Sequence, residues 1–222
     1  MPDPITARVE PTTPPAAAPA MSPDRRARGR ERRRNRVYDA ALALFMEKGF
    51  EETTMDDIAE RADVARTSVF NYFSPKTAFL DEWGTRRREE ALRAVESEHL
   101  EDASVAKVLQ RYMAVLGVLN ADARAECVVM MGASLKWNNV VGGSLLAGAL
   151  SDVLDQARLN NQIREDIDIR QAGLLLAVGY FAALATWIAV EPEPFDIRDY
   201  LAKLVNLILN GLLESPPHAS AD

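Results

Sequence analysis

The sequence predicts an all-helical protein of about nine helices, and two observations carry that prediction. Glycine and proline fall at the edges of apolar segments, and no alternating strand segment bounded by a hairpin turn occurs in the 222 residues. Apolar side chains instead recur at spacings of three and four, the period of one helix face. With 48% apolar residues, the chain can bury one large core or two small ones.

The N-terminal region combines a proline-rich leader with a dense run of arginines. Residues 1–24 contain seven prolines and almost no large apolar side chain, so we expect a disordered leader. The run that follows favours phosphate binding, because each neutralised phosphate releases counterions, although a solvated disordered segment has the same composition. Its members are Arg25, Arg26, Arg28, Arg30, Arg32, Arg33, Arg34 and Arg36.

Charge differs between the two halves of the chain. Residues 1–88 carry 16 Lys and Arg against 14 Asp and Glu, a balance of +2, whereas residues 89–222 carry 10 against 19, a balance of −9. A polyanion would therefore meet the N-terminal half. One cysteine, Cys127, and two histidines exclude a disulfide framework and a multi-cysteine or His-rich metal site, so we expect no metal and no cofactor. The absence of an apolar signal-peptide core favours a cytoplasmic protein.

The first expected helix is amphipathic and ends at a glycine. Gly49 is the stop signal, and Phe50 is expected to close over the helix end. The apolar stripe of this helix consists of Val37, Ala40, Ala41, Leu44 and Phe45.

Two short helices and a longer one come next. Thr54 is expected to cap the first short helix together with Asp57, and the inward stripe of that helix is Met55, Ile58, Ala59 and Ala62. The second short helix is expected to begin near Arg66 and to bury Val69 and Phe73. Ser74 and Pro75 then predict an immediate new helix start, which continues through Trp83 toward His99.

Five further helices are expected over about 103–120, 123–137, 141–160, 168–190 and 196–213. Asn- and Pro-rich turns separate them, and Asp168 and Asp196 are expected N-caps. Residues 215–222 are expected to be a disordered tail.

The second short helix has the chemistry of direct base readout. If Val69 and Phe73 face inward, then Arg66, Thr67 and Asn71 point outward, and these suit guanine, thymine and adenine edges. Two short helices after a longer one form a helix-turn-helix, whose second helix enters the DNA major groove. The side chains expected to contact flanking phosphates are Thr54, Ser68, Tyr72, Lys76, Arg32 and Arg33.

The segment "TTMDDIAERADVARTSVFNYFSPKTAFL" resembles the helix-turn-helix of the tetracycline-repressor (TetR) family, and the resemblance covers residues 33–80. Three residues depart from the family pattern: Asp63 replaces the usual turn glycine, Ala65 replaces a Ser cap, and Thr67 stands where Gly is common. The matching positions are Thr54, Ile58, Ala59, Ala62, Val64, Phe70, Tyr72, Phe73 and Lys76.

The resemblance implies a DNA-binding domain over residues 25–80, followed by a helical effector-binding and dimerisation domain over 81–214. It implies a homodimer formed through the last two helices, a palindromic operator and a small-molecule effector, expected to be largely apolar. Candidate pocket residues are Met113, Met130, Met131, Trp137 and Tyr180, although each is also an ordinary core residue.

Residues 172–190 are uncharged and long enough to span a membrane. Their acidic flanks and small residues such as Gly173 and Gly179 favour a buried dimer helix instead.

The alternative function is that of a helical enzyme or of a ligand-binding protein without a DNA role. A helical enzyme is disfavoured, because the sequence contains no phosphate loop, dinucleotide fingerprint, zinc-protease motif or nucleophile elbow, and no catalytic residue is predicted. A sequence-indifferent DNA architectural protein or a membrane-surface protein would be basic along much of its length, unlike the acidic C-terminal half. We therefore expect a site-specific transcriptional regulator, a repressor, whose binding to its operator is modulated by a small-molecule effector.

Overall fold

The computed structural model describes residues 23–100, 103–137 and 145–211, and these residues form nine α-helices and no strand. The all-helical prediction is therefore confirmed. The helices are α1 (Pro23–Lys48), α2 (Met55–Arg61), α3 (Arg66–Tyr72), α4 (Ala78–Ser97), α5 (Val105–Asp122), α6 (Arg124–Trp137), α7 (Leu145–Leu159), α8 (Ile169–Ile188) and α9 (Ile197–Asn210). The predicted tail and all but the last two residues of the predicted leader lie outside the described residues.

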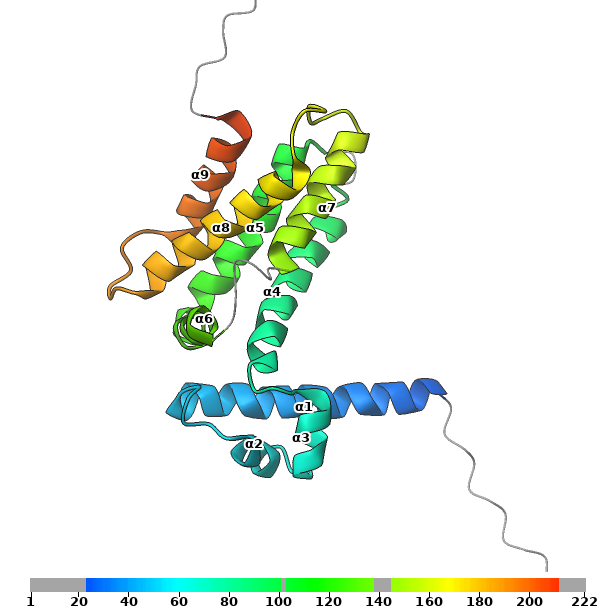
Figure 1. Cartoon of the computed structure of the whole chain (residues 1–222), viewed down its shortest axis with the longest axis vertical. Coiled ribbons are helices and arrows are strands. Elements are labelled where there is room, and N and C mark those ends of the chain that lie inside the picture. Colours follow the sequence, from blue (N-terminus) through cyan, green and yellow to red (C-terminus); the bar gives the residue numbers. More distant parts are fainter. Residues whose placement is uncertain (1–22, 101–102, 138–144, 212–222) are drawn as a thin grey trace, which may run out of the picture.

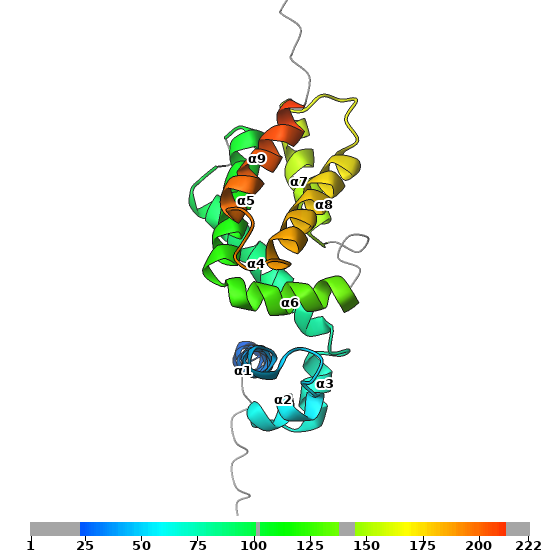
Figure 2. The same cartoon turned by 90° about the vertical axis from the view of Figure 1, so that its left-hand side faces the viewer.

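The chain forms a small N-terminal part and a larger C-terminal bundle. α2 and α3 lie on one side of α1, and the bundle lies on its other side (Figure 1). α6 crosses between the bundle and α1, as Figure 2 shows. In the bundle α7 packs on α8, and α5 packs on α9.

Helix α4 joins the two parts without a linker. Phe79, Leu80 and Trp83, at its N-terminal end, are buried in the same core as α1 and α3. The ring of Phe79 stacks on Phe73 at 4.2 Å between centroids. The predicted domain boundary at residue 81 thus falls inside one continuous helix.

The start of α4 differs from the prediction. The helix begins at Ala78 rather than at Pro75, because residues 75–77 form a turn. In that turn the carbonyls of Pro75 and Lys76 accept bonds from the amides three residues on, Ala78 and Phe79. The side chain of Lys76 also points away from α4, to the loop between α1 and α2.

Close backbone approach holds α7 against α8. A Cβ added at Gly173 would lie 2.3 Å from the Ser151 hydroxyl oxygen and 2.8 Å from the Ala147 carbonyl oxygen, so the contact requires glycine. Among the described residues, α8 alone is long and apolar enough to cross a membrane by length and composition. A core helix passes the same test, and eight α8 residues, including Leu176 and Leu184, are buried.

Candidate functional site

The turn between α2 and α3 has the geometry that a helix-turn-helix requires. Asp63 takes a left-handed conformation, with φ of 49°. Its amide bonds the Glu60 carbonyl and the next amide, that of Val64, bonds the Ala59 carbonyl, at 3.1 Å each. These two bonds form a Schellman motif, which ends α2 and starts the path to α3. Asp63 therefore fills the conformational role that glycine usually has there.

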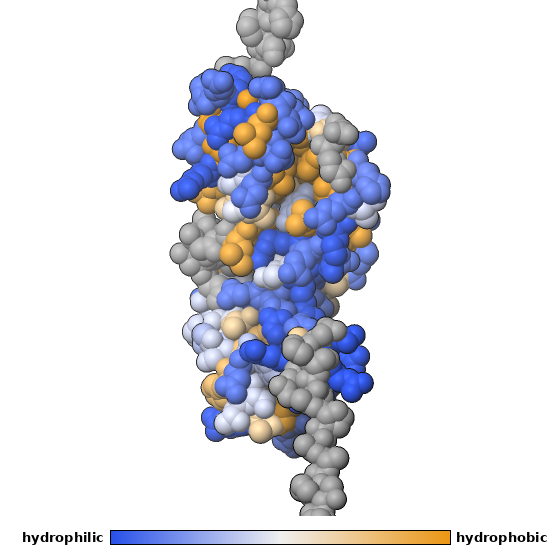
Figure 3. Space-filling model, turned by 90° about the vertical axis from the view of Figure 1, so that its right-hand side faces the viewer, coloured by the Kyte–Doolittle hydropathy of each residue, from blue (hydrophilic) through white to orange (hydrophobic). Residues whose placement is uncertain are grey.

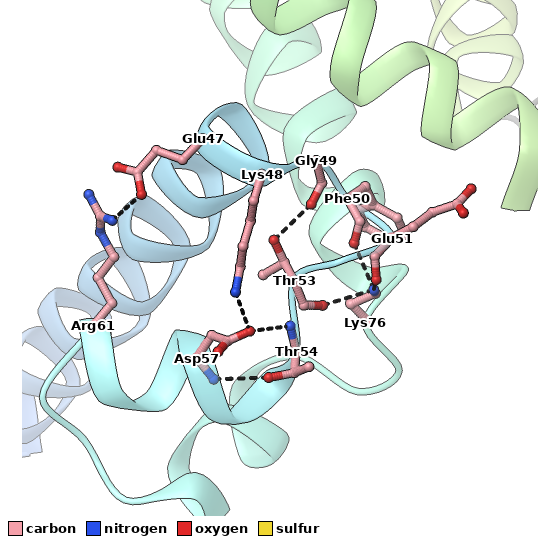
Figure 4. Close-up of polar contacts among 10 residues, drawn as sticks. All are labelled: Glu47, Lys48, Gly49, Phe50, Glu51, Thr53, Thr54, Asp57, Arg61 and Lys76. Carbon is pink, nitrogen blue, oxygen red and sulfur yellow. Dashed lines mark hydrogen bonds and ion pairs between the residues drawn. The ribbon is translucent and has the colours of Figure 1, made fainter.

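Helix α2 is capped as predicted. The Asp57 amide donates to the Thr54 hydroxyl oxygen at 3.1 Å, and the Thr54 amide donates to the Asp57 carboxylate at 2.7 Å (Figure 4). Lys48 donates to the same carboxylate at 2.6 Å. Bonds from Lys48 and Thr54 lower the pKa of Asp57 to about 2, so its carboxylate is ionised at neutral pH.

Helix α3 presents the predicted polar face to solvent. Val69 and Phe73 are buried, whereas Arg66, Thr67 and Asn71 are all exposed. Ala65 takes the N-cap position in an extended conformation, and its side chain makes no cap bond. The structure thus places the three predicted base-reading side chains together on the solvent-facing side of α3.

Arg66 has an internal partner in the free protein. Its guanidinium forms an ion pair with Asp56 at 2.9 Å, and its Cζ lies 5.4 Å from the centre of the Phe70 ring. Both members of the pair are exposed, and an exposed pair contributes about 0–1 kcal/mol. Arg66 can therefore exchange Asp56 for a base at little cost. Phe70 is 40% exposed, so the solvent-facing side of α3 also has an apolar surface.

Lys76, a predicted phosphate contact, bonds the loop between α1 and α2 in the free protein. Its ammonium donates to the carbonyls of Phe50 at 2.7 Å, Thr53 at 3.0 Å and Glu51 at 3.2 Å (Figure 4). An ammonium has three hydrogens, so these bonds use all of its donors. Burial lowers the pKa of Lys76. Lys76 therefore ties the start of α4 to the loop between α1 and α2.

The other predicted phosphate contacts lie at accessible positions. Arg32 and Arg33 are exposed on α1, and Thr54 is exposed at the start of α2. The Thr54 hydroxyl accepts the cap bond and keeps its own hydrogen for a further acceptor. Ser68 and Tyr72 are half-buried on α3.

The five predicted pocket residues do not gather in one cavity. Met113 and Met130 are fully buried in the core. Met131 and Tyr180 line a cavity of about 30 Å³, which is the size of one water molecule. Trp137 is 53% exposed and lines a separate cavity beside Phe50 and Lys76.

Larger cavities lie between α4, α5 and α7. One of about 430 Å³ is lined by Arg88 and Leu92 of α4, Tyr112 of α5 and residues of α7. A second of about 170 Å³ has a mainly apolar wall that includes Leu100 and shares Val153 and Gln156 with the first. The two adjoin and together make a groove whose wall is mainly apolar, with polar residues in both cavities, among them Arg88 in the larger and Glu96 in the smaller. On the side that Figure 3 shows, apolar residues reach the surface of this C-terminal part.

Arg88 and Tyr112 are two of the polar residues that line the larger cavity; the others are Thr85, Glu89, Asp152 and Gln156. The Tyr112 side chain is 3% exposed, and its hydroxyl has no hydrogen-bond partner in the described part of the chain. Burial raises the pKa of Tyr112 to about 12, so the hydroxyl keeps its proton. Burial also lowers the pKa of Arg88, whose guanidinium donates to the Thr85 hydroxyl at 2.8 Å. These two groups can donate to a ligand oxygen.

The sequence pattern does not predict this cavity, because the polar residues that line it are spread over three helices. Arg88 and Tyr112 are 24 positions apart. The sequence signal that indicates Tyr112 is its position beside Met113 on a largely apolar helix, where a hydroxyl is unusual. Cys127 is fully buried, and burial raises its pKa to about 12, which is typical of an unreactive thiol.

A shared carboxylate joins α4 to α6. The Trp83 indole NH donates to Glu126 Oε1 at 2.6 Å, and Arg87 donates to the same oxygen at 3.0 Å. Arg87 also donates to the Leu119 carbonyl at 3.2 Å. The segment of α4 between the N-terminal part and the cavity is thereby held at a defined position on α6.

Comparisons with known proteins agree with this architecture. Residues 37–83 match the sequence model of the bacterial regulatory proteins, tetR family. The fatty acid metabolism regulator protein of Bacillus subtilis is 21% identical over 184 residues, which cover 79% of this chain and 93% of that protein. The HTH-type transcriptional repressor KstR of Rhodococcus jostii is 40% identical over 65 residues, which cover 29% of this chain and 31% of that protein.

Solved structures show the same fold. Thermus thermophilus FadR, a TetR family repressor in complex with lauroyl-CoA, has a TM-score of 0.70 and 27% identity, with 85% of this chain and 100% of that chain covered. Bacillus subtilis FadR in complex with stearoyl-CoA has a TM-score of 0.59 and 20% identity, with 80% of this chain and 98% of that chain covered.

Proposed function

Because the chain belongs to the TetR family of bacterial transcriptional regulators, we propose that it is a homodimeric, cytoplasmic repressor released from its operator by a long-chain acyl-coenzyme A. The proposal that the protein binds DNA rests on α3, where Arg66, Thr67 and Asn71 are exposed to solvent. The opposite side of this helix is buried in the core. The acyl-coenzyme A part rests on the groove between α4, α5 and α7 and on the similarity to the lauroyl-CoA complex.

The groove suits a ligand with a long apolar chain and a polar end. The wall of the smaller cavity, with Leu100, Val105 and Val108, fits a hydrocarbon chain. Arg88 and the unpartnered Tyr112 hydroxyl are donors for a thioester carbonyl or a phosphate oxygen. A carbonyl bonded to Tyr112 would satisfy a buried hydroxyl that costs free energy while unpaired.

Helix α4 is the proposed link from the effector to DNA. Phe79, in the DNA-binding core, and Leu92, on the cavity wall, are 13 residues apart on one helix, which corresponds to roughly 20 Å. A ligand between α4 and α7 that shifts α4 must therefore move α3 with it. Release follows if the ligand binds more tightly to the conformation in which the two α3 helices no longer match their half-sites.

Exposed apolar residues on the last two helices support the proposed dimer. Leu174 and Leu175 of α8 and Tyr200 and Leu207 of α9 are exposed in the single chain. Packed against the same face of a second copy, they would bury a shared four-helix interface. Such a dimer reads two half-sites separated by about 34 to 36 Å or a multiple of it.

The test of DNA recognition begins with duplexes selected by the wild-type protein from genomic DNA. Arg66→Ala and Asn71→Ala are each expected to weaken binding to the selected duplex by about 1–3 kcal/mol and to relax base preference at one position. Binding to random DNA should change little. Equal losses on selected and random duplexes would contradict base readout by α3.

The effector test compares acyl-coenzyme A thioesters of increasing chain length with coenzyme A alone. We expect long-chain thioesters to release the selected duplex and coenzyme A to leave it bound. Val153→Trp, which places a bulky side chain at a residue that lines both cavities, should abolish release while duplex binding persists. Release that is unchanged in this variant would place the effector elsewhere.

A further inference from the structure

The N-terminal part of α1 extends beyond the segment that matches the family. Residues 23–36 precede the matched residues 37–83 and continue the same helix without a break. They contain eight arginines against two acidic residues, Asp24 and Glu31. In Figure 1 this end of α1 projects past α2 and α3. The arginine run is therefore a helical extension rather than the disordered arm that its composition allowed.

Some of these arginines have partners inside the protein. Arg34 forms two hydrogen bonds with the Glu82 carboxylate, at 2.8 and 2.5 Å, and the bonding raises the pKa of Arg34. Arg36 donates to the Asp63 carbonyl at 3.3 Å. These two side chains stabilise the joint between α1 and the rest of the chain.

Other arginines of the extension have none. Arg25, Arg30, Arg32 and Arg33 are exposed, and they make no hydrogen bond or ion pair within the described residues. Contacts within the protein thus explain the presence of Arg34 and Arg36 but not the presence of these four arginines. A cluster of exposed like charges on one helix repels itself and needs an anionic partner to be favourable.

The direction of this surface follows from helix periodicity. Arg25, Arg32 and Arg36 are separated by seven and four residues, so they lie on one face of α1. Arg36, at the end of that row, reaches the turn between α2 and α3. Figures 1 and 2 both place α2 and α3 on the side of α1 away from the bundle. The arginine row therefore faces the same side as the recognition helix.

We propose that the α1 extension binds the phosphate backbone of the operator outside the base pairs that α3 reads, and that it does so without reading sequence. The inference rests on the proposed DNA-binding function and adds a second contact region to it. The row from Arg25 to Arg36 spans 11 residues, or roughly 16 Å, about half of one turn of B-DNA. Guanidinium groups suit phosphates because they donate two parallel hydrogen bonds.

The experiment compares two duplexes that carry the same selected core. One ends at the core, and the other adds about 10 base pairs of random sequence on each side, roughly one helical turn. Full-length wild-type protein is compared with Arg25→Gln/Arg32→Gln/Arg33→Gln. The matched control, Arg93→Gln/Lys107→Gln/Arg164→Gln, removes three exposed charges from the C-terminal part.

We expect wild type and control to bind the flanked duplex at least about tenfold more tightly than the bare core. The arginine triple variant should bind both duplexes equally. Its salt dependence should also fall by roughly 0.9 per lost contact, up to about 5 for three arginines on each of two protomers.

The possible results separate the two proposals. If the wild-type protein binds both duplexes equally, the proposed contact with flanking phosphates is refuted, whereas the assignment as a repressor is unaffected. This result needs no variant. A flank preference that persists in the arginine triple variant, or that is lost equally in the control, also overturns the proposed contact. Failure of the wild-type protein to select any duplex from genomic DNA instead refutes the DNA-binding function itself.

Discussion

Replacing Lys76 with methionine should destabilise the N-terminal part without removing a DNA contact. The substitution keeps a chain of similar length but removes the ammonium that donates to Phe50, Glu51 and Thr53. It also removes a cation that lies 4.5 Å from the centre of the Phe50 ring. The loop between α1 and α2 then loses its connection to the start of α4.

The magnitude follows from these contacts. Hydrogen bonds to a charged group contribute about 1.5–3 kcal/mol, and an exposed cation–π contact contributes about 0.5–1 kcal/mol. Lys76 is half-buried, so water can reach part of the vacated site. We therefore expect Lys76→Met to lower the free energy of unfolding by about 2–4 kcal/mol. The control Lys107→Met, at an exposed site on α5, should change it by less than about 0.5 kcal/mol.

Urea unfolding measures the loss, and duplex binding as a function of salt measures the contact. If Lys76 is structural, the folded variant keeps the salt dependence of the wild type. If Lys76 instead contacts a phosphate, the dependence falls by about 1 per protomer and stability stays within about 0.5 kcal/mol. That second result would refute the structural role of Lys76.

Three further predictions concern the turn, the cap and the coupling. Asp63→Gly should raise the free energy of unfolding by about 1 kcal/mol, because glycine adopts the left-handed conformation freely; an unchanged urea midpoint would contradict this. Asp57 has a lowered pKa of about 2, so its contribution to the free energy of unfolding is present above about pH 4 and is lost as the pH falls toward 2. In acid titrations, Asp57→Asn should therefore lose less stability between pH 4 and pH 2 than the wild type does. Glu126→Gln should shift the acyl-coenzyme A concentration that releases DNA, whereas Asp166→Asn should not.

The helix-turn-helix could be predicted from sequence because local signals determine it. Thr54 and Asp57 are three residues apart, and the spacing of Val69 and Phe73 marks the buried side of α3. These are short-range patterns, and the structure contains the cap and the burial that they predict. Asp63 stands where the family pattern has glycine, and aspartate tolerates the left-handed conformation better than most residues do.

The cavity and the role of Lys76 could not be predicted in the same way. Lys76 bonds carbonyls 23 to 26 positions earlier in the chain, and nothing in the local pattern distinguishes such a lysine from one that contacts DNA. Cavities depend on what the packed helices fail to fill. The residue type of Met113 and Met130 suits the wall of an effector pocket, yet the packed helices bury both side chains completely. Arg88 and Tyr112 instead line a cavity.

The continuity of α4 limits how this regulator can be recombined with others. A hybrid sensor that grafts a foreign effector module onto this DNA-reading module must be spliced within one helix, where inserting a single residue rotates everything beyond it by about 100°. The hybrid must also keep Trp83 and Arg87 together with Glu126. A foreign module without this carboxylate would leave both side chains without the acceptor that they share. Chimeras cut after Arg87 with Glu126 retained should respond to their new inducer, and cuts elsewhere should yield proteins locked on or off.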